Sequence, residues 1–217
     1  MDLSGKTIVF QGDSITDMNR EKVSKRDQNH IYGHSYVFLI AGKLSFESPE
    51  TFGRIWNRGI SGNRSYDLLA RWQTDTLDLR PDLISVLVGI NDLLFPDEHH
   101  TSPDPDGYRR TLLEIVSLTR RSLGDVPFVF CEPFGFPDPL DENYRDLMTN
   151  GLPLYQEAMR NVAAETNSLF IPLQKPFCDA YAAHPSVGQA FWLWDGIHPT
   201  AAGHQLIARE WLRAVQG

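Results

Sequence analysis

The sequence has few of the features that mark disulfide-stabilised, membrane-spanning or nucleic-acid-binding proteins. Its 217 residues include only two cysteines, Cys131 and Cys178, without Cys-x-x-Cys spacing, so we expect reduced thiols rather than a disulfide framework. No window approaches the ~20 apolar residues that a membrane-spanning helix needs. The formal net charge of −8 argues against a nucleic-acid backbone or an anionic membrane as the main partner.

The sequence also lacks a signal-peptide stretch and an uninterrupted basic run. Residues 1–7 carry Asp2 and Lys6 and lack the apolar stretch of a secretory signal peptide, so we predict a cytoplasmic protein. The densest basic cluster, residues 20–26, is interrupted by Glu21 and is predicted to be a solvated loop. The length and the 41% hydrophobic content predict one domain, residues 1–217, with a substantial core.

Short apolar runs alternate with longer segments of helical periodicity. We predict strands at residues 7–11, 52–57, 82–88, 126–131 and 168–171. We predict helices at residues 35–46, 65–79, 108–123, 144–166 and 200–215, with Ser65 as an N-cap and a break at residues 151–153. This alternation predicts a parallel sheet with helices on both faces, whose ligand site lies at the carboxyl ends of the strands.

Four short polar motifs stand out, and the first three directly follow predicted strands. They are Gly12-Asp13-Ser14-Ile15, Asn57-Arg58-Gly59-Ile60-Ser61-Gly62, Gly89-Ile90-Asn91-Asp92 and Asp195-Gly196-Ile197-His198. Each motif alone is a weak signal, because such tetrapeptides commonly form turns or helix caps. Together they supply a serine nucleophile, oxyanion donors and an acid–histidine pair, which is a complete set for acyl transfer through a covalent intermediate.

The predicted catalytic triad is Ser14, His198 and Asp195. A serine hydroxyl is a poor nucleophile at neutral pH and needs a base within hydrogen-bond reach. The spacing of three residues lets Asp195 reach the His198 imidazole from the same turn and fix its tautomer, leaving the other ring nitrogen for Ser14. The alternative is that Asp195 caps the following helix and His198 is an incidental surface residue.

The predicted oxyanion hole consists of the Ser14 N–H, the Gly62 N–H and the Asn91 side-chain amide. Glycine allows its N–H to approach a reacting carbonyl without a Cβ in the way, and one such donor is worth roughly 3 kcal/mol in the transition state. Gly59 is interpreted as ordinary turn chemistry. For Asp13 and Asp92 we favour a structural role, in which their carboxylates tie loops together through backbone N–H groups.

Aromatic residues near the motifs are candidates for a substrate pocket. Trp192 and Trp194 flank the acid–histidine pair, and Phe134 follows the fourth predicted strand. Their rings could shape a small acyl pocket or stack on a sugar, and core packing is the alternative for each. The polar loop at residues 95–106 could overhang the site.

We predict no metal and no cofactor. His99 and His100 are adjacent, so their side chains diverge, and His204 lies inside a predicted helix, where packing or capping explains it. Cys131 could be considered as a nucleophile, but no histidine motif lies near it in sequence, and buried packing is the favoured interpretation.

The four motifs, in this order, resemble the sequence blocks of the SGNH hydrolases, the GDSL esterase and lipase family. The resemblance implies a flavodoxin-like three-layer αβα sandwich with a five-stranded parallel sheet. It also implies Ser14, Asp195 and His198 as the triad, Gly62 and Asn91 in the oxyanion hole, and hydrolysis of esters and some thioesters without a metal.

Further segments resemble intracellular serine acetylxylan esterases over nearly the whole chain. They are residues 59–63, 70–72, 165–170 and 202–204. This likeness implies deacetylation of xylo-oligosaccharides or related carbohydrates, and a homo-oligomer. Two alternatives stay open: a lipase, arylesterase or acyl thioesterase that acts on non-sugar substrates, and a non-catalytic carbohydrate-binding protein.

Overall fold

One parallel sheet of five strands organises the computed structural model, which describes residues 1–22, 27, 30–51, 54–95, 104–138, 140 and 142–217. The strands are β1 (Ile8–Gly12), β2 (Ile55–Asn57), β3 (Leu83–Leu87), β4 (Phe128–Cys131) and β5 (Leu169–Ile171). Their spatial order is β2-β1-β3-β4-β5, so β1 has β2 on one side and β3 on the other. The chain therefore passes from β1 outward to β2, and then crosses back over β1 to β3, β4 and β5.

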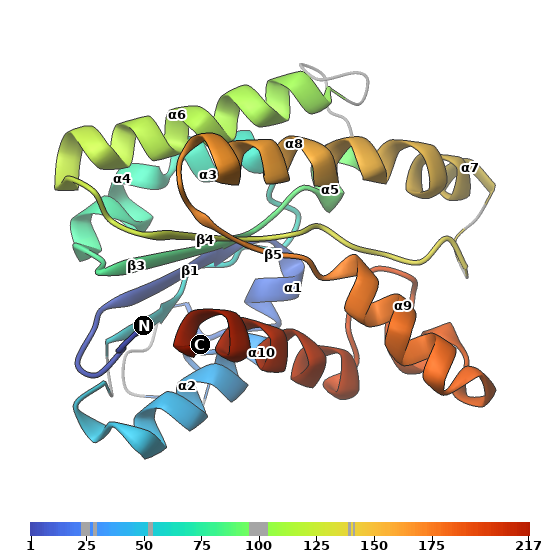
Figure 1. Cartoon of the computed structure of the whole chain (residues 1–217), viewed down its shortest axis with the longest axis horizontal. Coiled ribbons are helices and arrows are strands. Elements are labelled where there is room, and N and C mark those ends of the chain that lie inside the picture. Colours follow the sequence, from blue (N-terminus) through green and yellow to red (C-terminus); the bar gives the residue numbers. More distant parts are fainter. Residues whose placement is uncertain (23–26, 28–29, 52–53, 96–103, 139, 141) are drawn as a thin grey trace.

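Helices cover both faces of the sheet, which confirms the predicted three-layer αβα sandwich (Figure 1). One layer contains α3 (Ser65–Ala70), α4 (Trp72–Asp75), α6 (Pro105–Leu123) and α8 (Leu152–Glu165). The opposite layer contains α2 (Tyr36–Glu47) and α10 (Ala201–Gln216), with α9 (Gln174–Ala183) beside α10. Because both faces are covered, the central strands β1, β3 and β4 consist entirely of buried residues.

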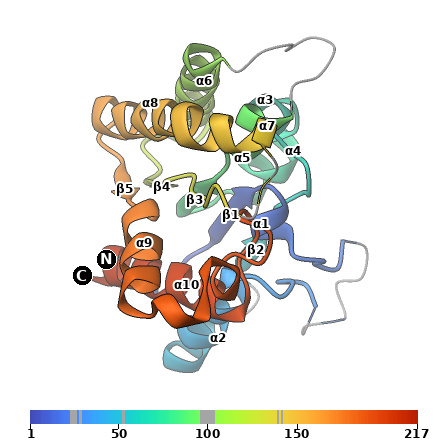
Figure 2. The same ribbon diagram turned by 90° about the vertical axis from the view of Figure 1, so that its right-hand side faces the viewer.

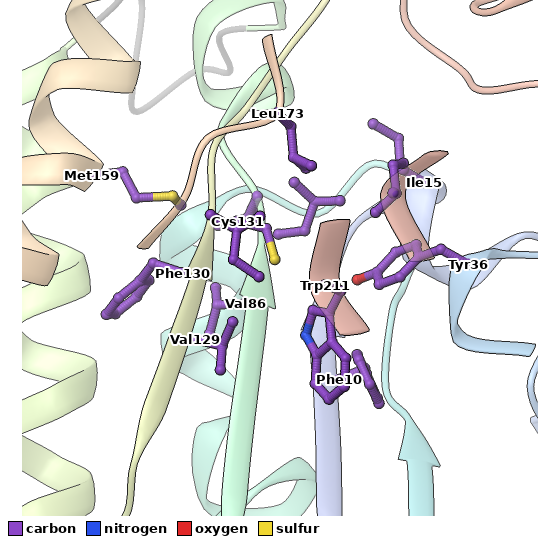
Figure 3. Packing of buried hydrophobic residues seen from close by; sticks show 14 of the residues in the cluster. Phe10, Ile15, Tyr36, Val86, Val129, Phe130, Cys131, Met159, Leu173 and Trp211 are labelled. Atoms are coloured by element: carbon purple, nitrogen blue, oxygen red, sulfur yellow. The ribbon is translucent and has the colours of Figure 1, made fainter. Parts of the chain in front are cut away.

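The core between the sheet and α10 is built around a tryptophan (Figure 3). The Trp211 ring is fully buried, and its centroid lies 5.2 Å from that of Phe10 on β1. Its indole N–H donates a hydrogen bond to the Ser85 hydroxyl on β3 at 3.0 Å. Cys131 is also fully buried, as predicted, and burial raises the pKa of its thiol to about 12. A buried thiol with a raised pKa stays protonated, so Cys131 packs in the core and does not act as a nucleophile.

A buried histidine connects the two helices of the same layer. The backbone N–H of Tyr36, at the start of α2, donates to His204 Nδ1 of α10 at 3.1 Å. Because Nδ1 accepts this bond, His204 is neutral and carries its proton on Nε2. The side chain is 2% exposed, and burial lowers its pKa to about 4. His204 is therefore a structural residue, as its position inside a predicted helix suggested.

Two predicted helices are interrupted in the structure. The segment at residues 65–79 divides into α3, α4 and a short 3-10 turn at Leu77–Leu79. Ser65 is not the N-cap of α3; Arg64 takes that position, and its backbone N–H donates to the Asp67 carboxylate at 2.8 Å. The irregularity predicted at residues 151–153 instead lies at Leu147–Gly151, where a π-helical turn separates α7 (Glu142–Asp146) from α8, and the backbone stays helical at Gly151 and Leu152.

Some features were not predicted from the sequence. α9 has only Phe177 as a fully buried residue, so it lacks the apolar stripe by which amphipathic helices are recognised. No helix among the described ranges is long and apolar enough to cross a bilayer. Of the predicted polar loop at residues 95–106, residues 96–103 lie outside the part that the structure describes.

The Trp211 contacts give a stability prediction. Trp211→Ala removes a fully buried indole and leaves the Ser85 hydroxyl without its donor, so we expect a loss of about 3–5 kcal/mol in the free energy of unfolding. Phe46→Ala is the control, because Phe46 is 89% exposed, and it should change stability by about 0.5 kcal/mol or less. Urea denaturation measures both; similar losses for the two variants would contradict the packing described here.

Candidate active site

Three of the four motifs meet at the carboxyl edge of the sheet, onto which Figure 2 looks. Ser14 begins the single-turn helix α1 (Ser14–Asp17) after β1. The loop that carries Gly62 follows β2, and Asn91 lies in α5 (Ile90–Leu94) after β3. Because β1 lies between β2 and β3, Ser14 lies between the loops that carry Gly62 and Asn91. This is the edge where ligands of open parallel sheets bind.

The structure joins Ser14, His198 and Asp195 by a chain of hydrogen bonds. The Ser14 Oγ lies 2.8 Å from His198 Nε2, and His198 Nδ1 lies 2.6 Å from Asp195 Oδ2. Since the carboxylate only accepts, Nδ1 carries the proton, and Nε2 is left as the acceptor for the serine hydroxyl. This arrangement can transfer the hydroxyl proton to the imidazole as the oxygen attacks.

The turn at residues 195–198 fixes the acid–histidine pair locally. The second carboxylate oxygen of Asp195, Oδ1, accepts the backbone N–H groups of Ile197 at 3.0 Å and His198 at 2.7 Å. Gly196 adopts a positive φ of 86°, which this tight turn requires. The hydrogen bond that His198 Nδ1–H donates to Asp195 raises the pKa of His198 above its ordinary value of 6.5. The carboxylate thus orients the ring and increases its basicity.

Three N–H donors near Ser14 are available to a ligand. Within the described residues, the backbone N–H groups of Ser14 and Gly62 donate to no protein acceptor. The Asn91 amide donates one hydrogen to the backbone oxygen of Asn63 at 3.0 Å, which orients the amide and leaves its second hydrogen free. The bond to Asn63 also connects α5 directly to the residue after Gly62.

The two glycines of the second motif differ in why they must be glycine. A Cβ at Gly59 would lie 2.4 Å from the backbone nitrogen of Asp17, so Gly59 allows the loop to pack directly on α1. Close approach, rather than ordinary turn chemistry, therefore explains Gly59. A Cβ at Gly62 would meet no protein atom within 4 Å, but Gly62 has a φ of 83°, where other residues are strained. Backbone conformation is therefore the requirement at Gly62.

Asp92 ties two segments of the site together through a backbone N–H group, as predicted, whereas the Asp13 carboxylate caps α1 within its own turn. Asp13 is 1% exposed and accepts from the Ile15 N–H at 3.0 Å, and burial raises the pKa of its carboxyl to about 7. Asp92 accepts from both the N–H and the hydroxyl of Ser65. Desolvation raises the pKa of Asp92 to about 6, although the Ser65 hydrogen bonds oppose this shift. Neither carboxylate is bonded to the triad.

Of the three aromatic candidates for a pocket wall, only Trp194 lies exposed beside the triad. Its side chain is 59% exposed, and its ring stacks on His198 with centroids 5.9 Å apart. Trp192 instead packs edge-to-face on Phe191 and lines a groove between α9 and α10 that contains none of the triad residues. Phe134 is wholly buried and stacks on Phe177 at 4.5 Å, so its assignment to the substrate pocket is corrected to core packing.

The sequence did not indicate two charged residues that hold the loop after β2. Asp17 accepts from the N–H and the hydroxyl of Ser61. Arg20 was assigned to a solvated loop, but its side chain is nearly buried and its Nε donates to the backbone oxygen of Gly59 at 2.8 Å. The only available signal was the position of Asp17, one helical turn after Ser14.

Metal binding has no support among the described residues. Within the described ranges, no group of three or more His, Cys, Asp or Glu side chains is arranged to hold an ion. His99 and His100 lie outside those ranges.

Comparisons with known proteins show the family to which the chain belongs. Residues 10–206 match the sequence profile of the GDSL-like lipase/acylhydrolase family. An acetylxylan esterase of Geobacillus stearothermophilus is 34% identical over 98% of this chain and 94% of that protein. The crystal structure of Axe2, an acetylxylan esterase of the same organism, has a TM-score of 0.83 at 31% identity, covering 99% of this chain and 95% of that one. A structure from Parabacteroides merdae, described as a GDSL-like lipase, has a TM-score of 0.88 at 32% identity, covering 98% and 96% of the two chains.

The glycine geometry predicts a graded effect of three Gly→Ala substitutions. Gly59→Ala should lower the free energy of unfolding by about 3 kcal/mol, because its Cβ collides with backbone. Gly62→Ala should cost about 1–2 kcal/mol of conformational strain. Gly42→Ala, in open space inside α2, should stabilise by up to about 1 kcal/mol. Thermal or urea unfolding gives the order; a Gly62 variant less stable than the Gly59 variant would contradict the assignment.

Proposed function

Because this chain belongs to the GDSL-like lipase/acylhydrolase family and is a carboxylic ester hydrolase, we propose that it removes short acyl groups from carbohydrates through an acyl-enzyme on Ser14. The acyl group proposed is acetyl, and the carbohydrate class is xylo-oligosaccharides or related sugars. The observation that carries the mechanism is the chain of hydrogen bonds from the Ser14 hydroxyl through His198 to Asp195.

In the proposed first half-reaction, the Ser14 Oγ attacks the ester carbonyl while His198 Nε2 takes its proton. The developing oxyanion is stabilised by the Ser14 N–H, the Gly62 N–H and the free hydrogen of the Asn91 amide. His198 then gives its proton to the sugar hydroxyl as it leaves, and Asp195 stabilises the imidazolium in between. In the second half-reaction, water attacks the acyl-enzyme with His198 as base, and Ser14 is regenerated.

Two observations support a carbohydrate substrate. The relatives identified above include acetylxylan esterases at 34% and 31% identity over nearly the full chain. Beside the triad, the exposed ring of Trp194 stacks on His198 and offers an apolar surface on which a sugar ring can lie.

A second candidate substrate is an aryl or longer-chain acyl ester. Phe95, at the end of α5, is 46% exposed and packs against the Tyr144 ring at 5.8 Å. Its exposed ring provides apolar surface that an acyl chain or an aryl group could cover. The catalytic steps are the same in both cases.

Acetate release from acetylated xylo-oligosaccharides, compared with hydrolysis of p-nitrophenyl acetate and p-nitrophenyl octanoate, tests the substrate proposal. We expect fast release from the sugar and slow hydrolysis of the octanoate. An inert sugar ester with active octanoate hydrolysis would move the substrate to lipid-like esters. Trp194→Ala should raise KM for the sugar ester more than for ethyl acetate, because ethyl acetate has no ring to stack on the indole.

Ser14→Ala tests the nucleophile. Loss of the hydroxyl leaves the oxyanion donors but no covalent route, so we expect kcat to fall by about 10⁴-fold or more with an unchanged unfolding midpoint. Ser117→Ala is the matched control, because the Ser117 hydroxyl only accepts a bond from Arg121 on the exposed face of α6. Wild-type turnover by the Ser14 variant would overturn the mechanism.

The pH dependence tests the acid–histidine pair. His198 acts as a base only when neutral, so kcat/KM should fall as the pH drops through its pKa, which Asp195 raises above 6.5. In Asp195→Asn the carboxylate is gone, so this limb should move to lower pH while the maximal rate falls by about 10⁴-fold. Asp179→Asn, which removes a surface ion pair with Lys175, is the control. An acid limb that stays in place in the Asp195 variant would exclude the proposed pairing.

A further inference from the structure

The loop that carries Gly62 is held on both sides by carboxylates from the elements that carry the other oxyanion donors. We define the oxyanion loop as residues 58–65. Its first part packs against the end of β1, where Ile60 N–H donates to the Gly12 oxygen at 3.1 Å, and its last residue begins α3. Between these points the Gly62 N–H faces no protein acceptor, so its direction depends on how the neighbouring residues are anchored.

Asp17 anchors the residue before Gly62. One oxygen of its buried carboxylate accepts the Ser61 N–H at 3.0 Å and the Ser61 hydroxyl at 3.1 Å. The Lys22 ammonium lies 3.0 Å from the same oxygen. Although burial alone would raise it, the pKa of Asp17 is lowered by Lys22 and Ser61, so the carboxylate is ionised at neutral pH. Asp17 lies on α1, whose first residue is Ser14.

Asp92 makes the same kind of contact at the other end of the loop. Its carboxylate accepts the Ser65 N–H at 3.0 Å and the Ser65 hydroxyl at 2.5 Å. Asp92 directly follows Asn91 on α5, and Asn91 itself donates to the Asn63 oxygen. Thus each carboxylate accepts both donors of one loop serine, and each lies on the helix of a different oxyanion donor.

We propose that Asp17 and Asp92 are positioning residues that fix the geometry of the oxyanion hole, by anchoring Ser61 and Ser65 on either side of the Gly62 N–H. Through them the three donors, which lie on three separate segments, form one unit. The inference rests on the roles proposed above for Ser14, Gly62 and Asn91, and it does not depend on the sugar substrate.

The effect of an oxyanion donor on the rate depends on its position. An oxyanion donor is effective only within a few tenths of an ångström of the position that the developing charge will occupy, and loss of one donor costs about 10²–10³-fold in kcat. A residue that merely stabilised the fold would lower the unfolding temperature and leave the turnover of the folded molecules unchanged. A positioning residue lowers kcat in molecules that remain folded.

The experiment measures p-nitrophenyl acetate hydrolysis by the full chain, for wild type, Asp17→Asn, Asp92→Asn and Asp82→Asn. We expect kcat to fall by about 10–100-fold in the first two variants, with KM within about twofold, because the donors act on the transition state. Asp82 is the matched control: it also accepts a backbone N–H, from Thr7 at 2.8 Å, and pairs with Lys6, but at the amino edge of the sheet. Asp82→Asn should retain wild-type kcat.

A small trifluoromethyl ketone separates positioning from stability. It forms a tetrahedral adduct with the serine whose oxyanion occupies the same donors as the transition state. Its inhibition constant should rise in each variant by the same factor by which kcat/KM falls. If kcat and the inhibition constant stay at wild-type values, or if the losses follow only the fraction of unfolded protein, the positioning role is wrong.

Milder variants keep the test decisive if an aspartate variant does not fold. Ser61→Ala and Ser65→Ala each remove one of the two bonds to a carboxylate and should lower kcat by several-fold, whereas Ser61→Thr restores the hydroxyl and should recover it. Wild-type kcat in both alanine variants would overturn the inference. Failure of the proposed mechanism is distinguishable, because Ser14→Ala would then hydrolyse p-nitrophenyl acetate like the wild type.

Discussion

The active site depends on one recurring interaction, the hydrogen bond from a backbone N–H to an ionised carboxylate. Asp195 accepts two N–H groups of its own turn, Asp17 accepts that of Ser61, and Asp92 accepts that of Ser65. Such charge-assisted bonds are shorter and stronger than bonds between neutral groups. Loops lack the regular backbone hydrogen bonds of helices and sheets, so hydrogen bonds to carboxylates hold their backbone in place. Part of the excess of acidic residues therefore serves to shape loops.

This use of carboxylates follows from where a parallel sheet puts its site. The strands end at one edge, and beyond it each segment must make its own contacts. The sheet places β1 between β2 and β3, which brings Ser14 between the other two motifs, but it does not orient a single side chain. Orientation comes from short elements such as α1 and α5, which are too short to be stable without the loop that they hold.

The sequence was sufficient for the features that depend on periodicity and on motif order. Buried strands, the longer helices and the pairing of His198 with Asp195 follow from local patterns, and the pairing of His198 with the distant Ser14 followed from the order of the four motifs. Phe134 was assigned to the pocket because a hydrophobic residue after a strand looks the same whether it faces the core or the site. Arg20 was assigned to solvent because its carbonyl partner is 39 residues away in sequence. Contacts of this kind are set by tertiary packing and leave no periodic signal.

The two histidines that the chain places in helix α10 and in the turn before it respond to acid in different ways. We expect His198 to gain a proton first, since its pKa is raised, so that activity falls while the protein is still folded. His204 is neutral when folded and has a pKa of about 4 against 6.5 unfolded, so its contribution to stability is complete above pH 6.5 and is lost as the pH falls toward 4. That loss, about 3 kcal/mol, is a large part of a typical folding free energy. Activity is therefore expected to be lost before the fold. Circular dichroism recorded beside activity during acidification should show a pH interval in which the protein is inactive but still folded.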